Sequence, residues 1–102
     1  MRSVFIATLA ALGIVLSGQV HADEALAKAK NCMACHAIDK KLVGPSYKDV
    51  AAKYTGDAGA AATLAAKVKT GGKGVWGAVP MPPNIVTPEE AARLVAWVLS
   101  QK

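Results

Sequence analysis

The sequence predicts an all-α fold of about four to five short helices. Three observations support this fold class. Apolar residues recur at helical spacing, glycines and prolines mark the ends of the segments that carry them, and β-branched and polar residues nowhere alternate over the length of a strand. The chain has 102 residues, which is enough for one domain, and no internal repeat is apparent.

Residues 1–22 have the layout of a secretory signal peptide, so the folded domain is expected to comprise residues 23–102. Arg2 supplies a positive charge, an apolar run covers residues 4–16, and residues 20–22 offer a small-residue cleavage site. An uncleaved membrane anchor is the alternative, but the apolar run is shorter than the ~20 residues that a spanning helix needs. The protein is therefore expected to be exported, with its signal peptide removed and without stable membrane insertion.

Two helical segments are expected in the first half of this domain. Residues 23–30 are rich in Ala, Lys and Glu, and their expected apolar face contains Ala25, Leu26 and Ala29. After a loop over residues 39–46, a short helix is expected over residues 48–54. Its apolar face contains Val50, Ala51 and Tyr54.

A longer helix is expected over residues 58–70, because Gly71 and Gly72 provide a stop signal after it. Its apolar stripe consists of Ala61, Leu64, Ala65 and Val68. Residues 71–84 are rich in glycine and proline, which forbid a regular helix or a central strand, so this segment is expected to be a loop.

The last helix has the clearest start signal in the chain. Thr87 is the expected N-cap, Pro88 occupies the first helical position, and Glu90 completes a capping box. Its apolar face contains Ala91, Leu94, Val95 and Val98, and Trp97 is expected to pack against the first helix.

Residues 32–36 form a Cys-x-x-Cys-His motif, which is typical of covalent haem attachment. Two thiols separated by two residues can reach the two vinyl groups on one edge of a porphyrin. The next residue, His36, then falls beneath the iron, where imidazole is an expected ligand. The sequence therefore predicts one haem c, attached through Cys32 and Cys35 and ligated by His36.

Three other interpretations of this motif are weaker. A zinc site needs a second pair of Cys or His ligands, and residues 23–102 contain none. A thioredoxin-like redox pair normally lies in a βαβ unit, which is missing. A disulfide between Cys32 and Cys35 closes too short a loop to stabilise a fold.

Met81 is the expected sixth ligand of the iron. Met33 lies inside the attachment motif and cannot reach the opposite haem face, whereas Met81 lies in a loop framed by prolines. Flanking prolines restrict the unfolded loop and help to aim one side chain. The alternatives are that Met81 fills a gap in the core or that a lysine binds the iron. His/Met ligation is the arrangement found in cytochromes c, where it raises the reduction potential.

These residues favour an electron carrier over an enzyme. A haem enzyme or gas sensor needs an open iron site with an acid–base residue beside it, and residues 23–102 have no spare His. A fixed subunit of a larger redox complex is a third possibility. The 12 Lys and Arg against 7 Asp and Glu give a modest net charge of +5, and the lysines are scattered, so nucleic acid is not an expected partner.

The sequence resembles the small bacterial class I cytochromes c of the cytochrome c-551/c-552 family. The resemblance covers residues 23–102 in order and is carried by the segments 32–36, 43–45, 47–54, 74–77, 80–84 and 97–102. It implies the small class I cytochrome c fold, with the helices wrapped around one covalently bound haem. It also implies a monomeric periplasmic carrier that passes electrons between transient redox partners, such as a nitrite reductase, a terminal oxidase or an upstream cytochrome complex.

The resemblance further implies roles for four residues. The carbonyl of Pro45 accepts a hydrogen bond from the outer ring N–H of His36, and Trp76 donates its indole N–H to a haem propionate. Lys67 lies where some relatives carry an arginine near the same propionate. Asn84 forms a hydrogen bond near the sulfur of Met81.

Overall fold

The computed structural model describes residues 23–102, and the predicted signal peptide lies outside the described residues. The helical elements are residues 23–29, the 3-10 turn η1 (Cys32–Ala34), α2 (Tyr47–Lys53), α3 (Ala60–Thr70) and α4 (Pro88–Leu99). Within residues 23–102, β pairing is limited to the isolated bridges His36↔Lys41 and Gly72↔Met81. The predicted all-α class is confirmed.

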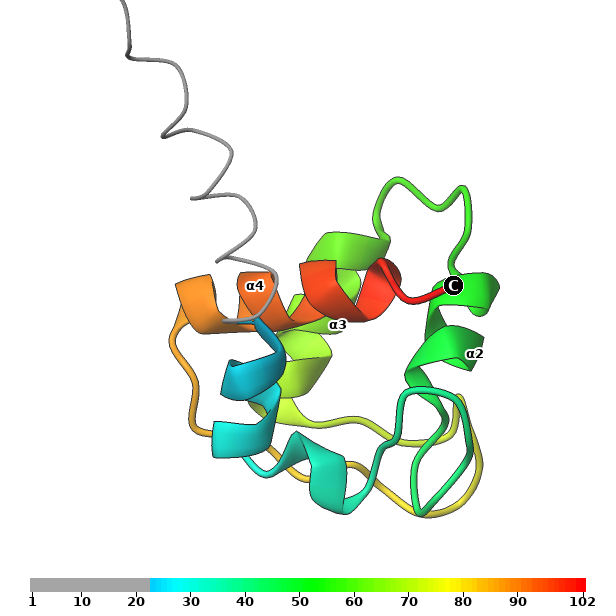
Figure 1. Ribbon diagram of the computed structural model, residues 1–102, viewed down its shortest axis with the longest axis horizontal. Helices are drawn as coiled ribbons and strands as arrows, with labels where there is room; N and C mark the ends of the chain where they lie inside the picture. Colours follow the sequence, from blue (N-terminus) through cyan, green and yellow to red (C-terminus); the bar gives the residue numbers. More distant parts are fainter. Residues whose placement is uncertain (1–22) are drawn as a thin grey trace, which may run out of the picture.

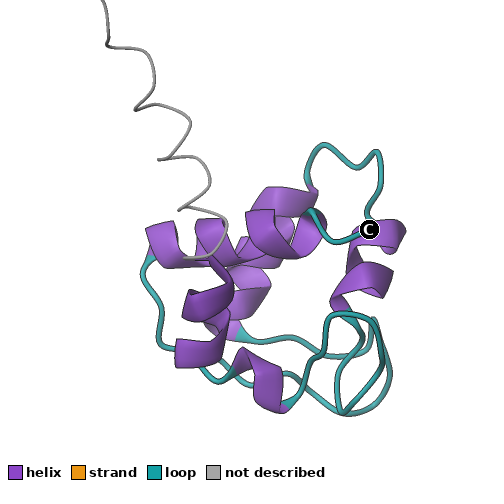
Figure 2. Ribbon diagram, viewed as in Figure 1, coloured by secondary structure: helices purple, strands orange, loops and turns teal. Residues whose placement is uncertain are grey.

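Helix α4 crosses the molecule and packs against both α3 and α2 (Figure 1). Residues 23–29 lie beside the N-terminal half of α4, whereas α2 stands at the other end of the molecule. The loops that follow η1 and α3 run along the side of the molecule away from α4 (Figure 2). The helices and these loops together line the cavity described below.

The first helix meets α4 through one small residue and two ion pairs. Ala27 is 1% exposed and belongs to a core cluster with Tyr47, Leu94 and Trp97, so the predicted contact of Trp97 with the first helix is confirmed. Asp23 pairs with Arg93 at 3.0 Å and Lys30 pairs with Glu90 at 3.6 Å.

The predicted apolar face of this first helix is confirmed only in part. Leu26 is half-buried and packs against the core cluster, whereas Ala25 and Ala29 are exposed. The contact with α4 also uses Asp23, Ala27 and Lys30, at helical spacing i, i+4 and i+7. Two of these three positions carry charges that pair with α4, so apolar periodicity alone does not reveal them. The alanine between them lets the two helices approach closely.

Helix α2 begins one residue earlier than predicted because Ser46 is its N-cap. The hydroxyl of Ser46 accepts a hydrogen bond from the backbone N–H of Asp49 at 3.0 Å. The buried face of α2 is Tyr47, Val50 and Ala51, while Tyr54 is the half-buried C-cap.

Helix α3 begins at Ala60, two residues later than predicted, and its last residue is Thr70. Gly71 is the C-cap, and its φ of 84° lies in the left-handed region that glycine tolerates. The predicted stripe is only partly confirmed. Ala61 is exposed, and Leu64, Ala65 and Val68 are half-buried. Leu64 and Val68 line the cavity described below, and Val68 also packs against the core cluster.

The predicted capping box of α4 is confirmed. The backbone N–H of Glu90 donates to the hydroxyl of Thr87 at 3.1 Å, and the backbone N–H of Thr87 donates to the carboxylate of Glu90 at 2.9 Å. Pro88 is the first helical residue, as predicted. The hydrogen bond from Thr87 is the main reason why the pKa of Glu90 is lowered, with smaller contributions from Lys30 and Arg93.

Candidate functional site

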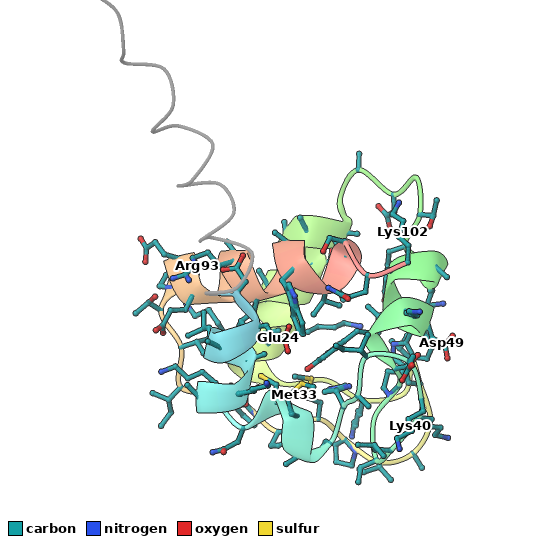
Figure 3. All side chains as sticks on the ribbon, viewed as in Figure 1. Glu24, Met33, Lys40, Asp49, Arg93 and Lys102 are labelled. Atoms are coloured by element: carbon teal, nitrogen blue, oxygen red, sulfur yellow. The ribbon has the colours of Figure 1, made fainter. Side chains whose placement is uncertain are left out.

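A cavity of ≈ 270 Å³ lies between the helices and the loop that follows α3. Cys32, Cys35, His36 and Met81 all line it, although Met81 is far from the other three in the sequence. The rest of the wall is mainly apolar and comes from every helix of the described part of the chain, including Ala27, Val50, Leu64, Val68, Leu94, Val95 and Val98. Side chains from these elements converge on the interior in Figure 3.

The turn η1 places both thiols and the imidazole on one side of the backbone. Asn31 precedes η1 in the left-handed conformation, with φ 64°, and the N–H groups of Cys35 and His36 both donate to the carbonyl of Cys32. Residues at i, i+3 and i+4 of such a turn share a face. Both cysteines are half-buried, and burial raises the pKa of the Cys32 thiol.

The imidazole of His36 is held by the loop before α2. Its Nδ1 lies 2.8 Å from the carbonyl oxygen of Pro45. Since a carbonyl only accepts, Nδ1 carries the proton and Nε2 keeps a free lone pair. The hydrogen bond expected for Pro45 is therefore present.

Gly44 allows the loop to pass close to this ring. A Cβ atom at Gly44 would lie 2.5 Å from Cε1 and 2.9 Å from Nδ1 of His36. The backbone N–H of Gly44 also donates to the carbonyl of Cys35 at 2.8 Å, which ties the loop to the attachment motif. Only glycine fits this position without displacing the imidazole.

Tyr47 supports the same imidazole from its face. The two rings are stacked, with centroids 5.2 Å apart and an interplanar angle of 25°, and Trp97 meets Tyr47 edge-on at 5.1 Å. Tyr47 is 4% exposed, and burial, followed by the charges of Cys32 and Cys35, raises the pKa of its hydroxyl well above the usual range.

Sequence reasoning missed Gly44 and Tyr47 as parts of the site. Gly44 directly precedes Pro45, which was recognised, and Tyr47 follows the N-cap Ser46, so the signal for both was present. Tyr47 is placed on the buried face of α2 only once Ser46 is recognised as the N-cap that begins the helix.

The loop that carries Met81 is closed at its base by paired hydrogen bonds. The N–H of Gly72 donates to the carbonyl of Met81 at 3.1 Å, and the N–H of Met81 donates to the carbonyl of Gly72 at 2.8 Å. A Cβ atom at Gly71 would lie 2.6 Å from the Met81 oxygen, so glycine is needed there for close approach as well as for its positive φ. The half-buried Met81 thus enters the cavity from a fixed backbone position.

The remaining predicted residues occupy the rim or lie behind it. Trp76, 40% exposed, and Lys67 both line the cavity, and the aliphatic part of Lys67 lies near Gly72. Asn84 does not line the cavity. Its side-chain amide donates to the carbonyl of Val68 at 2.9 Å and to that of Pro82 at 3.3 Å, which anchors the end of the loop to α3.

In residues 23–102, no three His, Cys, Asp or Glu side chains come together as a metal-binding group. None of the helices in the same range is both long and apolar enough to span a bilayer.

The residues of the cavity fit a haem. Two thiols on one turn suit covalent attachment, an imidazole with a free Nε2 suits iron, and a thioether from the loop is a second donor of the type found in cytochromes c. The apolar wall suits the macrocycle. Lys41, Lys67 and Lys73 line the same cavity and can face propionate groups.

Comparisons with known proteins identify the family. The family model described as "Cytochrome c" matches residues 23–102. Cytochrome c-551 of Pseudomonas aeruginosa is 54% identical over 104 residues, covering 100% of both chains, and cytochrome c-551 of Azotobacter vinelandii is 62% identical over 79 residues, covering 78% of this chain and 96% of the relative. The solved structure of wild-type cytochrome c552 of Nitrosomonas europaea matches with a TM-score of 0.75 and 50% identity, covering 78% of this chain and 99% of that one.

The expected small class I cytochrome c fold is confirmed by the structural match, and the expected cofactor is confirmed by the family together with the Cys-x-x-Cys-His motif. Within this family the relatives named above are electron carriers rather than enzymes. The chain therefore belongs to the cytochrome c family, and it is an electron carrier that holds haem c covalently through Cys32 and Cys35.

Proposed function

We propose that the protein is a periplasmic one-electron carrier whose haem iron is bound by His36 and Met81. The observation that carries this proposal is that both side chains line one cavity together with the two attachment cysteines. When bound, haem supplies an iron that accepts and releases one electron. The residues of the chain determine which atoms face that iron and how strongly they donate to it.

His36 is prepared to bind iron through Nε2. The hydrogen bond from Nδ1–H to the Pro45 carbonyl fixes the tautomer and the ring orientation, and it increases the basicity of the other nitrogen. Gly44 and Tyr47 restrict the ring further, at its Cε1 edge and on its face. These contacts hold the donor atom in one position in both redox states, which suits rapid electron exchange.

Met81 supplies a thioether, a soft and uncharged donor that favours the reduced iron. The Gly72 pairing at the base of the loop and the Asn84 bonds to the end of α3 support its backbone. We further propose that Asn84 influences the sulfur of Met81 from this position. With Met81 as a ligand, the iron would have no open position for oxygen or peroxide chemistry.

The rim residues are proposed to bind the propionate groups. Trp76 lines the cavity and can donate its indole N–H, and Lys67 can contribute a positive charge. Lysine lacks the planar fork of arginine, so its contact with a carboxylate is less directional.

We propose that residues 1–22 are removed on export to the periplasm and that the mature protein is a monomer with transient redox partners. The match to the Azotobacter vinelandii relative supports a mature domain of about the length of residues 23–102, because 78% of this chain covers 96% of that one. A nitrite reductase, a terminal oxidase and an upstream cytochrome complex are the proposed classes of partner. Such contacts are small, commonly below about 1,200 Å² of buried surface.

Substitution of Met81 tests the ligand assignment. Met81→Ala should abolish the near-infrared absorption band of sulfur bound to ferric haem, allow CO or cyanide to bind readily and lower the reduction potential. Met33→Ala is the matched control, since Met33 is half-buried against the core cluster and does not line the cavity. The band should survive in the control. Its survival in Met81→Ala would show that another residue binds the iron.

A further inference from the structure

The ammonium group of Lys53 lies over two aromatic rings. Its Nζ is 5.8 Å from the centroid of the Tyr54 ring and 5.7 Å from the centroid of the Trp76 ring. Both distances fall within the range of ≈ 6 Å over which a cation is attracted to a ring face. Lys53 is in the last turn of α2, whereas Trp76 lies in the loop after α3, so this contact joins two separate parts of the chain.

The loop segment 73–80 has few other anchors. All of its residues are exposed. The hydrogen bond from Gly74 N–H to the Gly77 carbonyl, at 3.2 Å, is internal to the segment, and the Gly72–Met81 pairing closes its base. In the described part of the chain, no hydrogen bond connects residues 73–80 with another element.

Lys53 forms no ion pair with a carboxylate of residues 23–102. Within residues 23–102 the ion pairs are Lys28–Glu24, Lys30–Glu90 and Arg93–Asp23. The negative end of the α2 dipole favours a cation in this last turn, which helps to keep the ammonium group at the helix end beside Tyr54. Lys53 is exposed, and its ammonium group nevertheless lies over both rings.

We propose that Lys53 is a positioning residue for Trp76, and that its cation–π contacts hold the segment 73–80 against the end of α2 at the mouth of the cavity. Trp76 lines the cavity, so the placement of its indole depends on this contact. The proposal concerns the rim and does not depend on which residue binds the iron.

The test compares variants of the mature holoprotein by NMR. Lys53→Met keeps an unbranched chain of similar length without the charge, and Lys53→Arg keeps the cation. Lys48→Met is the matched control. Lys48 is exposed on the same helix, and its ammonium group lies over no aromatic ring of residues 23–102. Lys53→Met should lower the order parameters of residues 73–80 and speed hydrogen exchange of the Trp76 indole N–H by about two- to fivefold. Lys53→Arg should restore both.

A double-mutant cycle with Trp76→Leu measures the contact itself. Lys53 and Trp76 should be coupled by about two- to fivefold in the equilibrium constant for unfolding, whereas Lys48 and Trp76 should show no coupling. Amide protection in α4 verifies that every variant is folded. If Lys53→Met matches Lys48→Met in the order of residues 73–80 and in the coupling, the proposal is wrong.

Discussion

The imidazole of His36 stacks on the phenol ring of Tyr47, with centroids 5.2 Å apart and 25° between the planes. Trp97 in turn meets Tyr47 edge-on, so a row of three rings leads from the haem attachment motif to α4. The orientation of the His36 imidazole is therefore linked to the packing of the core. This relationship leads to the first prediction.

Tyr47→Leu should destabilise the protein by about 1–3 kcal/mol, because it removes two aromatic pairs worth ~0.5–1.5 kcal/mol each beyond their buried area. Denaturant unfolding monitored by the haem absorbance measures this loss. Tyr47→Phe is the control and should retain most of the stability, since it keeps both ring contacts. An equal loss in the two variants would assign the effect to the hydroxyl group instead of the rings.

Gly44→Ala should displace the His36 ring, because the added Cβ would lie 2.5 Å from Cε1. Overpacking of this kind costs typically ~1–3 kcal/mol. We expect a lower melting temperature and altered paramagnetic shifts of the His36 ring protons in the NMR spectrum of the ferric protein. Gly59→Ala is a suitable control, since the nearest atom to its Cβ is 3.6 Å away. Unchanged His36 shifts in Gly44→Ala would show that the loop moves and the ring does not.

The capping box of α4 should make stability depend on pH in the acid range. The pKa of Glu90 is lowered in the folded protein, chiefly by the hydrogen bond from Thr87 N–H, so the carboxylate stabilises the fold above its ordinary pKa of 4.5. This contribution is lost as the pH falls through the lowered value. Melting temperatures of the wild type and Glu90→Gln should therefore converge on acidification. A gap that stays constant from neutral to acid pH would contradict this.

The contribution of the Thr87 hydroxyl to the same capping box is tested separately. Thr87→Ala should cost about 1 kcal/mol, the usual value for loss of an N-cap side chain. The measurement is the midpoint of denaturant unfolding at neutral pH, and Thr63→Ala, an exposed substitution within α3, is the control.

Exposed apolar residues at the mouth of the cavity should contact redox partners. Val79 is 65% exposed and lines the cavity, whereas Ile85 is 94% exposed and does not. Val79→Asp should slow electron transfer to a purified partner by about tenfold or more, and Ile85→Asp, which adds the same charge elsewhere, should have a much smaller effect. Stopped-flow rates measured at several salt concentrations check this. Equal effects of the two variants would indicate that net charge alone controls the encounter.

Much of the fold was predictable because its signals are local. The capping residues Thr87 and Glu90, the stop at Gly71 and the glycine- and proline-rich loop are determined by backbone chemistry within a few positions. The attachment motif was predictable for the same reason, since its chemistry depends on spacing within a single turn.

What sequence reasoning missed depends on contacts between distant segments. The first helix contacts α4 through Ala27 between two charged residues, and its apolar pattern reveals only Leu26 of the packed face. Gly44 and Tyr47 belong to the site because of where the loop before α2 passes the His36 ring. That Lys53 lies near Trp76 follows only from the three-dimensional path of the loop after α3.

The ion pair between Asp23 and Arg93 joins positions 70 residues apart. Closing a loop of this length costs chain entropy, although the cost grows only slowly with length. The core cluster that Ala27 shares with Leu94 and Trp97 is therefore complete only when the first helix and α4 are docked on each other. Ala27 and Leu94 also line the cavity that contains Cys32 and Cys35, so the two ends of the domain enclose the attachment site together.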